Sequence, residues 1–316
     1  MKRSLVILRA VVVLACVIGI AAVVYYGKKA GLFGRRPVIP PPDYSKYEKI
    51  DPKLMIYRET SSIAVNMEKP AGVGTGPDGK IYVSGDKLVV FDPEGKQALE
   101  TVLDAPAYCV TADEDGLIYM SVGDHIEIYD GSGKKKAAWE SAGKDAVLGS
   151  VVVAGDYVFA ADVKGRVLLR YDMLGSPNGR AEGFIVYGSR NIGMTLDEEG
   201  SLWVANPGRL ELRRYSEEMK VVAAWRRMGR QPNGFSGCCN PDHIAAASDG
   251  TIVTSEKHIV RVKVVDRTGE LIGVVAGPKE LEGMEWAPPI AVTPDDKVLI
   301  LDAGKKQVRV FRRKSG

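Results

Sequence analysis

Two adjacent cysteines, Cys238 and Cys239, are the residues whose type and spacing most directly suggest chemistry. They lie in the segment GFSGCCNPDHI, in which His243 follows Cys239 by four residues. Two thiolates beside an imidazole could bind a soft metal ion or take part in thiol redox chemistry. The sequence has no C-x-x-C motif and no Cys/His spacing typical of zinc or iron–sulfur sites. The other interpretations are a disulfide between the two residues and a pair of free thiols.

The redox compartment bears on these three interpretations. In an exported domain a disulfide is expected, because thiols are oxidised there. A bond between adjacent residues closes a small ring and strains the peptide, and strained disulfides are more easily reduced. Cys16 lies in an apolar N-terminal run, and Cys109 is expected to be a small buried residue on an inner strand. We therefore expect a vicinal disulfide that shapes the loop, with a metal or redox site and free thiols as open alternatives.

Side chains that carry oxygen atoms offer a second kind of chemistry. Asn191, Asp242 and Glu256 lie in the segments SRNIGM, CCNPDHI and TSEK. Carboxylate and amide oxygens that converge at one point suit a divalent cation such as Ca²⁺. An enzyme with such a site would be a hydrolase or a lyase, with His243 as a further participant. The residues are far apart in the sequence, so the site depends on a fold that brings them together.

The chain from about residue 54 consists of six similar units. Each has a turn followed by a short strand of alternating hydrophobicity, as in GPDGKIYVSG and DEEGSLWVAN, and then a second strand, as in LVVFD and VRVFR. The intervals between successive turns are 37, 40, 44, 50 and 46 residues, measured between the markers Gly79, Gly116, Asp156, Gly200, Gly250 and Asp296. Six units of four strands predict an all-β fold, a six-bladed β-propeller.

The ring is expected to close through its N-terminal segment. The last unit reaches the end of the sequence without an outer strand, and LMIYRETSSIAV, residues 54–65, precedes the first unit and can supply that strand. An open edge strand would invite aggregation, which favours closure. We therefore expect one propeller domain over residues 54–316.

The units resemble NHL repeats, a propeller motif in which P-x-G-hydrophobic is followed by D-G-x-hydrophobic-aromatic-V. KPAGVGTGPDGKIYVSG matches the pattern best, and the resemblance covers roughly residues 54–316. The GCCNP loop, followed by a DG-hydrophobic-VTSEK strand, resembles a combination in bacterial NHL-type proteins. The resemblance implies the propeller architecture. It does not imply one activity, because such propellers include binding platforms, lyases and lactonase-like hydrolases.

The lactonase-like propellers hold a metal with Glu, Asn and Asp, and RNIG and NPDH are similar to the contexts of the last two. The segment KPAG offers no counterpart of the Glu ligand. That difference counts against transferring the activity to this chain.

Propeller geometry places the candidate residues on one face, where the first strand of each blade starts and the second strand ends. Asp162 and Asp302 end second strands, and they are expected to cap the following turns, since Asp bonds its own backbone there. Glu is a poor turn residue, so Glu256 is a better ligand candidate. The full set of candidates for a ligand-binding face is Asn191, Asn206, Cys238, Cys239, Asn240, Asp242, His243, Glu256 and Asp302.

The N-terminal segment predicts a membrane anchor. Residues 10–26 carry no charge, and the apolar run from about residue 5 to residue 26 has the length of a spanning helix. Tyr25 and Tyr26 suit the membrane interface, and no small-residue cleavage site follows. We expect an uncleaved anchor within residues 1–36, and a Pro-rich, extended spacer over residues 37–53.

The charge distribution argues against nucleic acid as a partner. Residues 1–36 hold seven basic and no acidic residues, which leaves 36 basic against 40 acidic residues in the remainder, a net charge of −4. Basic residues flank both ends of the apolar run, so the positive-inside rule gives no orientation. A single N-terminal anchor commonly delivers the following domain across the membrane, so we expect the propeller to be extracytoplasmic, in a periplasm or at the cell surface.

The sequence therefore favours a membrane-tethered propeller that acts as a non-catalytic binding platform for a protein or a small ligand. It carries no Walker loop and no Ser or Cys nucleophile beside a His at an inferable distance. Two alternatives stay open. One is a metal-dependent hydrolase or lyase of the lactonase-like kind, and the other is an accessory protein of a membrane redox system that uses Cys238 and Cys239.

Overall fold

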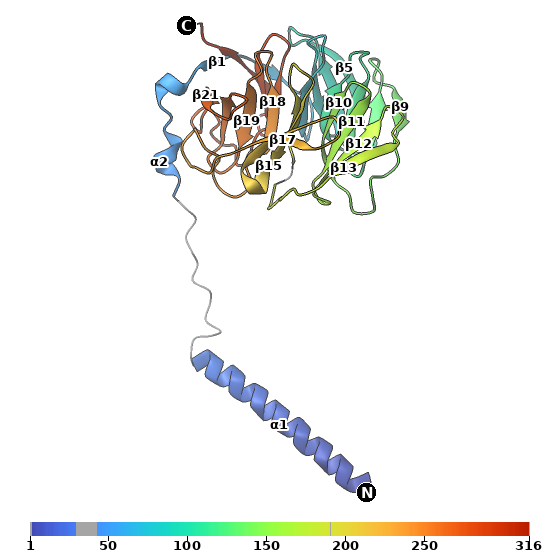
Figure 1. Ribbon diagram of the computed structural model, residues 1–316, viewed down its shortest axis with the longest axis vertical. Helices are drawn as coiled ribbons and strands as arrows, with labels where there is room; N and C mark the ends of the chain where they lie inside the picture. Colours follow the sequence, from blue (N-terminus) through green and yellow to red (C-terminus); the bar gives the residue numbers. More distant parts are fainter. Residues whose placement is uncertain (1, 30–42, 190, 316) are drawn as a thin grey trace. The chain divides into compact units, whose positions relative to one another are not determined.

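The computed structural model describes residues 2–29, 43–189 and 191–315, which divide into two units, Met1–Asp43 and Tyr44–Gly316 (Figure 1). In the first unit the structure describes helix α1, Lys2–Lys29. Its stretch Val11–Lys29 has a mean hydropathy of 2.1 and is long and apolar enough to cross a membrane. The prediction of one apolar N-terminal helix is thereby confirmed, while Pro37, Pro40, Pro41 and Pro42 of the predicted spacer lie outside the described residues.

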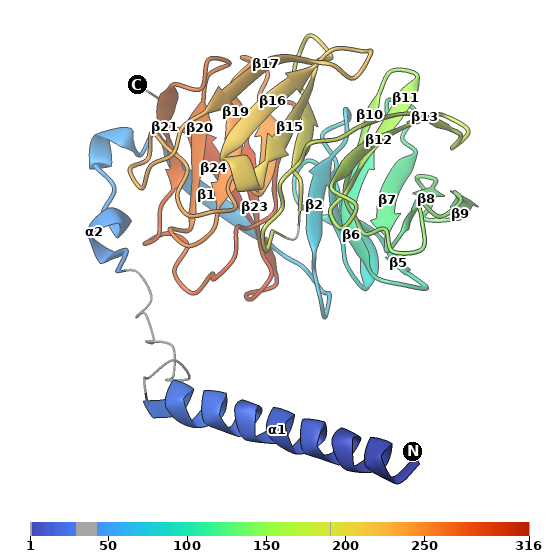
Figure 2. The same ribbon diagram turned by 60° about the horizontal axis from the view of Figure 1, so that its bottom comes forward.

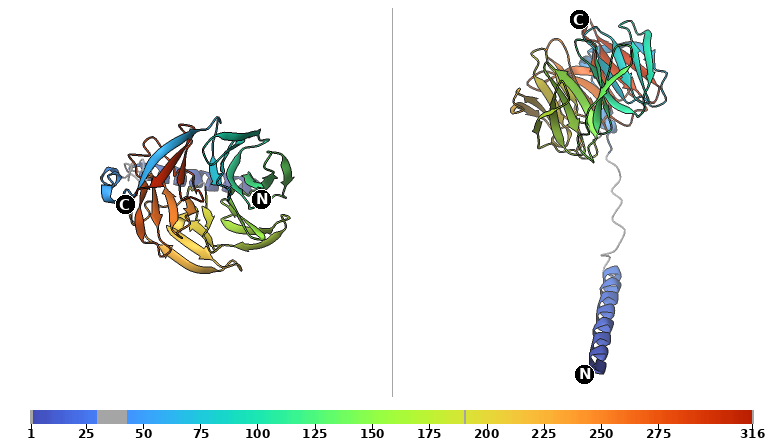
Figure 3. Two further views of the ribbon diagram at one scale, coloured as in Figure 1. Left: turned by 90° about the horizontal axis from the view of Figure 1, so that it is seen from above. Right: turned by 90° about the vertical axis from the view of Figure 1, so that its right-hand side faces the viewer.

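The second unit is a ring of six four-stranded antiparallel sheets, the blades of a β-propeller (Figure 3, left). Numbered in chain order and listed from the innermost strand outward, blades 1 to 3 are β2 Gly72–Thr75, β3 Ile81–Ser84, β4 Lys87–Phe91, β5 Gln97–Val102; β6 Ala107–Ala112, β7 Ile118–Val122, β8 His125–Tyr129, β9 Lys135–Ala138; and β10 Leu148–Ala154, β11 Tyr157–Asp162, β12 Val167–Asp172, β13 Pro177–Ala181. Blades 4 to 6 are β14 Met194–Leu196, β15 Leu202–Asn206, β16 Glu211–Tyr215, β17 Val221–Arg226; β18 His243–Ala246, β19 Ile252–Glu256, β20 Arg261–Val265, β21 Leu271–Ala276; and β22 Ile290–Val292, β23 Val298–Asp302, β24 Gln307–Arg313, β1 Tyr57–Ala64.

The N-terminal strand closes the ring, as the sequence predicts. Strand β1 pairs antiparallel with β24, from Tyr57 opposite Arg313 to Ala64 opposite Gln307 (Figure 2). Arg309 of β24 donates to the Glu59 carboxylate of β1 through Nε at 3.0 Å and Nη2 at 2.5 Å. This bidentate contact adds geometric specificity to the pairing. The last blade thus combines strands from both ends of the domain, and the inner strands of successive blades contact one another around the whole ring.

The turn markers work through their backbone conformation. Five of them have φ between 59° and 78° and donate their N–H to the carbonyl three residues earlier: Gly79, Gly116, Gly200, Gly250 and Asp296. Glycine is favoured there because it adopts positive φ without a Cβ penalty. In the third unit the left-handed residue is Gly155 and not Asp156, because β10 and β11 are joined by a two-residue hairpin with Ala154 opposite Tyr157.

The hydrophobic core lies between neighbouring blades. Val73 and Val83 of blade 1 pack with Leu299 and Leu301 of blade 6. Each of the six buried clusters joins residues of two neighbouring blades in the same way. Burying one such side chain stabilises the fold by about 1.5–3 kcal/mol. A blade without its neighbours would leave this surface exposed, so the ring is the stable unit.

The described part of the predicted spacer is ordered and packs on the propeller. Residues 44–54 contain helix α2, Ser45–Glu48, and the 3₁₀ helix η1, Pro52–Leu54. The Arg230 guanidinium lies 5.6 Å from the ring centroids of both Tyr44 and Tyr47, a cation–π arrangement. Met55 forms a bridge to Val274 of β21. The propeller unit therefore begins before residue 54, the boundary expected from the repeats.

Candidate ligand-binding site in the central channel

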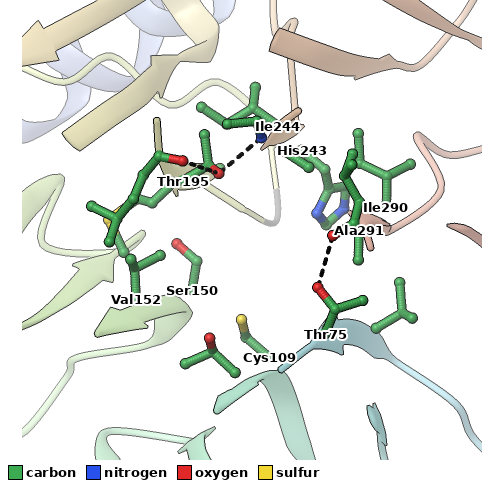
Figure 4. Close-up of a pocket in the computed structure, with 18 of the residues that line it drawn as sticks. Thr75, Cys109, Ser150, Val152, Thr195, His243, Ile244, Ile290 and Ala291 are labelled. Carbon is green, nitrogen blue, oxygen red and sulfur yellow. Dashed lines mark hydrogen bonds between the residues drawn. The ribbon is translucent and has the colours of Figure 1, made fainter. Parts of the chain in front are cut away.

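The inner strands of all six blades surround a central cavity of about 670 Å³ (Figure 4). Its lining is dominated by small and apolar residues. Among the described lining residues, only Asp197 and Glu198 carry a carboxylate, and both follow the end of β14. The opposite end of the cavity, where the inner strands start, is lined by neutral polar groups. This end is the face on which the sequence places the candidate residues.

Hydroxyl groups along the channel connect neighbouring inner strands. Thr75 donates to the Val292 carbonyl at 2.8 Å, and Ser150 donates to the Ile192 carbonyl at 2.5 Å. Thr195 accepts a hydrogen bond from the Ala246 amide at 2.9 Å (Figure 4). These hydroxyls are engaged in holding one blade to the next, so they contribute shape more than free hydrogen-bonding capacity.

Asn191 and His243 are the candidate residues that line the cavity. The Asn191 amide nitrogen donates to the Asp242 carbonyl at 3.2 Å and lies 2.8 Å from His243 Nδ1. A carbonyl oxygen can only accept, so the Asp242 contact fixes which end of the Asn191 amide is nitrogen. Asn191 Oδ1 is left without a partner although the residue is only 6% exposed. Among the buried unpartnered polar atoms of the described residues, it is the one whose residue lines the channel.

The same contact sets the tautomer of His243. Because Asn191 donates to Nδ1, that nitrogen must be the acceptor, and the ring proton then resides on Nε2. Burial lowers the pKa of His243, and the nearby Lys257 charge lowers it further, while Asp242 opposes the shift. His243 is therefore a neutral imidazole that offers an N–H donor beside the Asn191 acceptor.

Asp242 is buried and supports this pair from behind. Its carboxylate accepts a short hydrogen bond from the Ser189 hydroxyl, and its Oδ2 lies 4.0 Å from the Lys257 ammonium. Lys257 also donates to the Gly188 carbonyl at 2.9 Å. Asp242 is thus engaged in joining the segment before β14 to the start of β18, and it positions Asn191 through its backbone carbonyl.

Glu256 belongs to a different network and does not face the channel. The residue is fully buried, and its carboxylate contacts Arg261 Nε at 2.8 Å, Lys263 Nζ at 2.9 Å and the Ser236 amide at 3.2 Å. Burial alone would raise the pKa of Glu256, but the Lys263 and Arg261 charges outweigh burial and hold it below its ordinary value. The expectation that Glu256 faces a ligand is corrected here, since its oxygens are engaged by two cations.

The remaining polar candidates stabilise loops. Asn240 is fully buried, donates to the Ser236 and Lys257 carbonyls at 2.7 and 3.1 Å, and accepts from the Lys257 amide at 2.9 Å. Asn206 accepts from the Ile185 amide at 2.9 Å. Asp302 accepts from the Lys305 amide at 2.9 Å, the turn cap that the sequence predicts.

Asp162 also caps its turn, as expected, because it accepts from the Val147, Lys164 and Gly165 amides.

The described residues contain no group of three or more His, Cys, Asp or Glu side chains placed to hold a metal ion. The divalent cation inferred from Asn191, Asp242 and Glu256 stays a prediction.

The cysteine pair lies on the loop before β18. Cys238 is exposed and Cys239 is buried, and their sulfur atoms are 3.0 Å apart, longer than the roughly 2.05 Å of a disulfide bond. Both are free thiols in this structure. The Cys239 thiol donates to the Tyr187 carbonyl. Burial, together with the hydrogen bond to Cys238, raises the pKa of Cys239 to about 12. The vicinal disulfide therefore stays a prediction about the oxidised state.

Sequence reasoning missed the channel lining and the partners of Glu256. Thr75 lies four residues before its turn marker Gly79, and His243 lies seven residues before Gly250. Counting back from each marker by such a distance would therefore have identified the inner strands. Arg261 and Lys263 are two residues apart on a strand and share a face. Two cations in the otherwise apolar run RVKVV are a signal that a buried acid lies nearby.

Comparisons with known proteins support the fold. No protein-family model matches the chain, and no curated protein matches its sequence. The structure of a streptogramin B lyase is 14% identical with a TM-score of 0.61, covering 84% of this chain and all of the other. A virginiamycin B lyase from Staphylococcus aureus is 16% identical with a TM-score of 0.55, covering 80% of this chain and 88% of the other. A chain of a mitotic checkpoint complex is 11% identical with a TM-score of 0.59, covering 89% of this chain and all of the other. At these identities the likeness establishes the six-bladed β-propeller fold and nothing further.

Proposed function

We propose that this protein is a membrane-tethered binding platform that holds a small, neutral ligand at the end of the channel where the inner strands start. The observation that carries the proposal is the unpartnered Asn191 Oδ1, in a channel-lining residue whose amide nitrogen contacts the channel-lining His243. A buried acceptor without a partner costs about 1–3 kcal/mol. A ligand amide would satisfy both groups, because its N–H donates to Asn191 and its carbonyl accepts from His243.

The buried carboxylates near this pair are already engaged, which favours binding over catalysis. Asp242 is paired with Ser189 and Lys257, and Glu256 with its two cations. The group on His243 Nδ1 is an amide, which cannot accept a proton as the carboxylate of a catalytic dyad would. A neutral ligand would also avoid the desolvation cost of bringing a charge into this lining.

Exposed aromatic side chains at the same end of the blades extend the proposed site. Tyr108 lies at the start of β6 and lines the cavity, Tyr187 lies in the segment before β14, and Trp286 lies in the segment before β22. Each is about half exposed. Large flat rings bury much apolar area at low entropic cost, so they suit a ligand with an aromatic or apolar part.

N-acetyltryptophanamide is a suitable probe, because it is neutral and joins an aromatic ring to two amides. N-acetyltryptophan is its matched anionic control. With the full chain in detergent, calorimetry or ligand-observed NMR should show tighter binding of the neutral probe. Asn191→Ala and His243→Ala should each weaken it about fivefold, the equivalent of one hydrogen bond of about 1 kcal/mol. The surface variant Glu100→Gln serves as control. Equal affinity for both probes, or no binding of either, would contradict the proposal.

The tether and its orientation are part of the same proposal. Helix α1 has the length of a membrane span, and the repeat pattern resembles NHL propellers that bind partners on one face. We expect the propeller to be extracytoplasmic. Fusions of alkaline phosphatase and of a fluorescent protein to the C-terminus test this, because alkaline phosphatase matures only outside the cytoplasm. Activity of the cytoplasmic reporter alone would refute the orientation.

A lyase is the second candidate, and His243 is the observation that favours it. A neutral imidazole in the channel could act as a general base if a substrate displaced the Asn191 amide from Nδ1. The streptogramin B lyase and virginiamycin B lyase structures have this fold, and a catalytically inactive histidine-to-alanine variant of the latter holds quinupristin. Incubation with quinupristin, followed by mass spectrometry, tests the idea. Turnover by the wild type that His243→Ala loses would replace the binding platform by an enzyme, and no turnover would exclude this lyase activity.

A further inference from the structure

The loop before β18 places two thiols of opposite accessibility in contact. Cys238 is exposed, while Cys239 is 3% exposed and donates to the Tyr187 carbonyl. Their sulfur atoms are 3.0 Å apart, so closing a bond requires a movement of about 1 Å. An accessible thiol with a second thiol poised behind it is the arrangement that thiol–disulfide exchange requires, one to attack and one to resolve.

We propose that Cys238 and Cys239 form a reversible thiol–disulfide exchange site for a small-molecule disulfide of the glutathione type. Cys238 is the attacking residue and Cys239 the resolving residue. The proposal is independent of the ligand proposed for the channel, because its reactant meets the exposed sulfur at the surface of the loop.

The exchange proceeds in two balanced steps. Cys238 loses its proton to water, and its thiolate attacks one sulfur of glutathione disulfide. A Cys238–glutathione bond forms, the bond within glutathione disulfide breaks, and one glutathione thiolate leaves and takes a proton from water. Cys239 then loses its proton, and its thiolate attacks the Cys238 sulfur and releases the second glutathione, which is protonated in turn. Two protein thiols are oxidised by two electrons, and one glutathione disulfide is reduced to two glutathione molecules.

Covalent geometry makes the product easy to reduce. Consecutive Cα atoms across a trans peptide are about 3.8 Å apart, whereas disulfide-bonded residues usually have Cα atoms about 4.4–6.8 Å apart. A bond between Cys238 and Cys239 is therefore strained, and strained disulfides are the readily reduced ones. The pair is thus suited to report the redox state of its surroundings and to return to thiols when reductant is added.

Oxidation also removes a hydrogen bond to the segment that precedes Asn191 in the sequence. In the disulfide Cys239 has no S–H, so its hydrogen bond to the Tyr187 carbonyl is broken. Gly188 and Ser189 follow Tyr187, and they contact Lys257 and Asp242, the residues behind the Asn191 and His243 pair. The oxidised loop should therefore hold the 184–189 segment less firmly.

The proposal is tested with the full chain in detergent, equilibrated in buffers that contain increasing fractions of glutathione disulfide. Free thiols are then blocked, and the peptides are analysed by mass spectrometry. The peptide that contains both cysteines should lose two hydrogens and regain them in excess glutathione, while Cys109 stays reduced as an internal control. In Cys239→Ser the Cys238–glutathione adduct should accumulate, because no resolving thiol is present.

In Cys238→Ser, adduct formation on Cys239 should be several-fold slower than on Cys238 in Cys239→Ser. Cys239 is only 3% exposed, so glutathione disulfide reaches it less readily, and burial, the largest cause of its raised pKa, remains in this variant and lowers its thiolate fraction. Wild-type thiols that stay reduced in glutathione disulfide alone, equal reactivity of the two single variants, or a disulfide that excess glutathione does not reduce would each overturn the proposal.

Discussion

Replacing Glu256 by Gln is the most direct test of the buried ionic cluster in blade 5. The substitution keeps the shape of the side chain and removes its negative charge. Arg261 and Lys263 then share a fully buried site without a counter-charge. The new amide group also presents N–H donors to two groups that can only donate. We therefore expect a large loss of stability.

The magnitude follows from the buried charges that the substitution leaves without a partner. Glu256 accepts from Arg261, Lys263 and the Ser236 amide. Removing one partner of a buried ion pair costs about 3–5 kcal/mol, because the other charge is left uncompensated. At roughly 2–4 °C per kcal/mol for a domain of this size, the Tm should fall by about 6–20 °C. Part of this loss should disappear as the pH rises, because burial lowers the pKa of Lys263, removal of the Glu256 charge lowers it further, and the ammonium can then become neutral.

Urea and thermal unfolding of the full chain in detergent measure the effect, with Glu100→Gln as the matched control. Glu100 forms its ion pair with Lys87 at the surface, where such pairs contribute little. The double variant Glu256→Gln with Lys263→Met should recover part of the lost stability, because it removes one of the two stranded cations. A loss for Glu256→Gln no larger than that for Glu100→Gln would refute the assignment of Glu256 to the fold and return it to the ligand candidates.

Three further expectations concern the same fold. Between pH 8 and 10 the unfolded chain binds a proton at Lys263 that the folded chain does not, so wild-type stability should rise with pH and Lys263→Met should lack this rise in urea unfolding. A chain that starts at residue 44 should elute as a monomer in size-exclusion chromatography, whereas one that starts at residue 66 lacks β1, exposes the edge of β24 and should self-associate. Asn240→Ala should cost at least about 2 kcal/mol, because it leaves three buried backbone groups unpaired, while the exposed Asn233→Ala should change the free energy of unfolding little.

The architecture was predictable because the repeated signal is local. Positive φ at Gly79 or Gly200 favours a residue without a Cβ, and an alternating strand follows each such turn, so turn chemistry and periodicity agree in most units. The closure by β1 followed from the cost of an open edge strand. The exception, Gly155 in place of Asp156, arises where a two-residue hairpin replaces the longer turn, a difference that shifts the marker by one residue.

The site was only partly predictable, because the state of a polar side chain depends on partners that are distant in the sequence. Asn191 and His243 were expected on the face where the inner strands start, and both line the channel, although the channel lining itself was not predicted. Whether Glu256 faces a ligand depended on Arg261 and Lys263 of the next strand, whose side chains point toward it. Propensity and spacing describe where a strand ends, but they do not describe which neighbour neutralises the charge at its end.

Asp242 connects the two sites that this fold presents on one face. Its backbone carbonyl positions the Asn191 amide, and its carboxylate accepts from Ser189, which lies two residues after the carbonyl that Cys239 contacts. Between Cys239 and Asp242 the chain has only Asn240 and Pro241, and Asn240 is held by three hydrogen bonds to backbone groups. A rearrangement of the cysteine pair cannot be absorbed by that rigid link. It must therefore be taken up by the segment that carries Tyr187 and Ser189, which is the segment that leads to Asn191 and the channel.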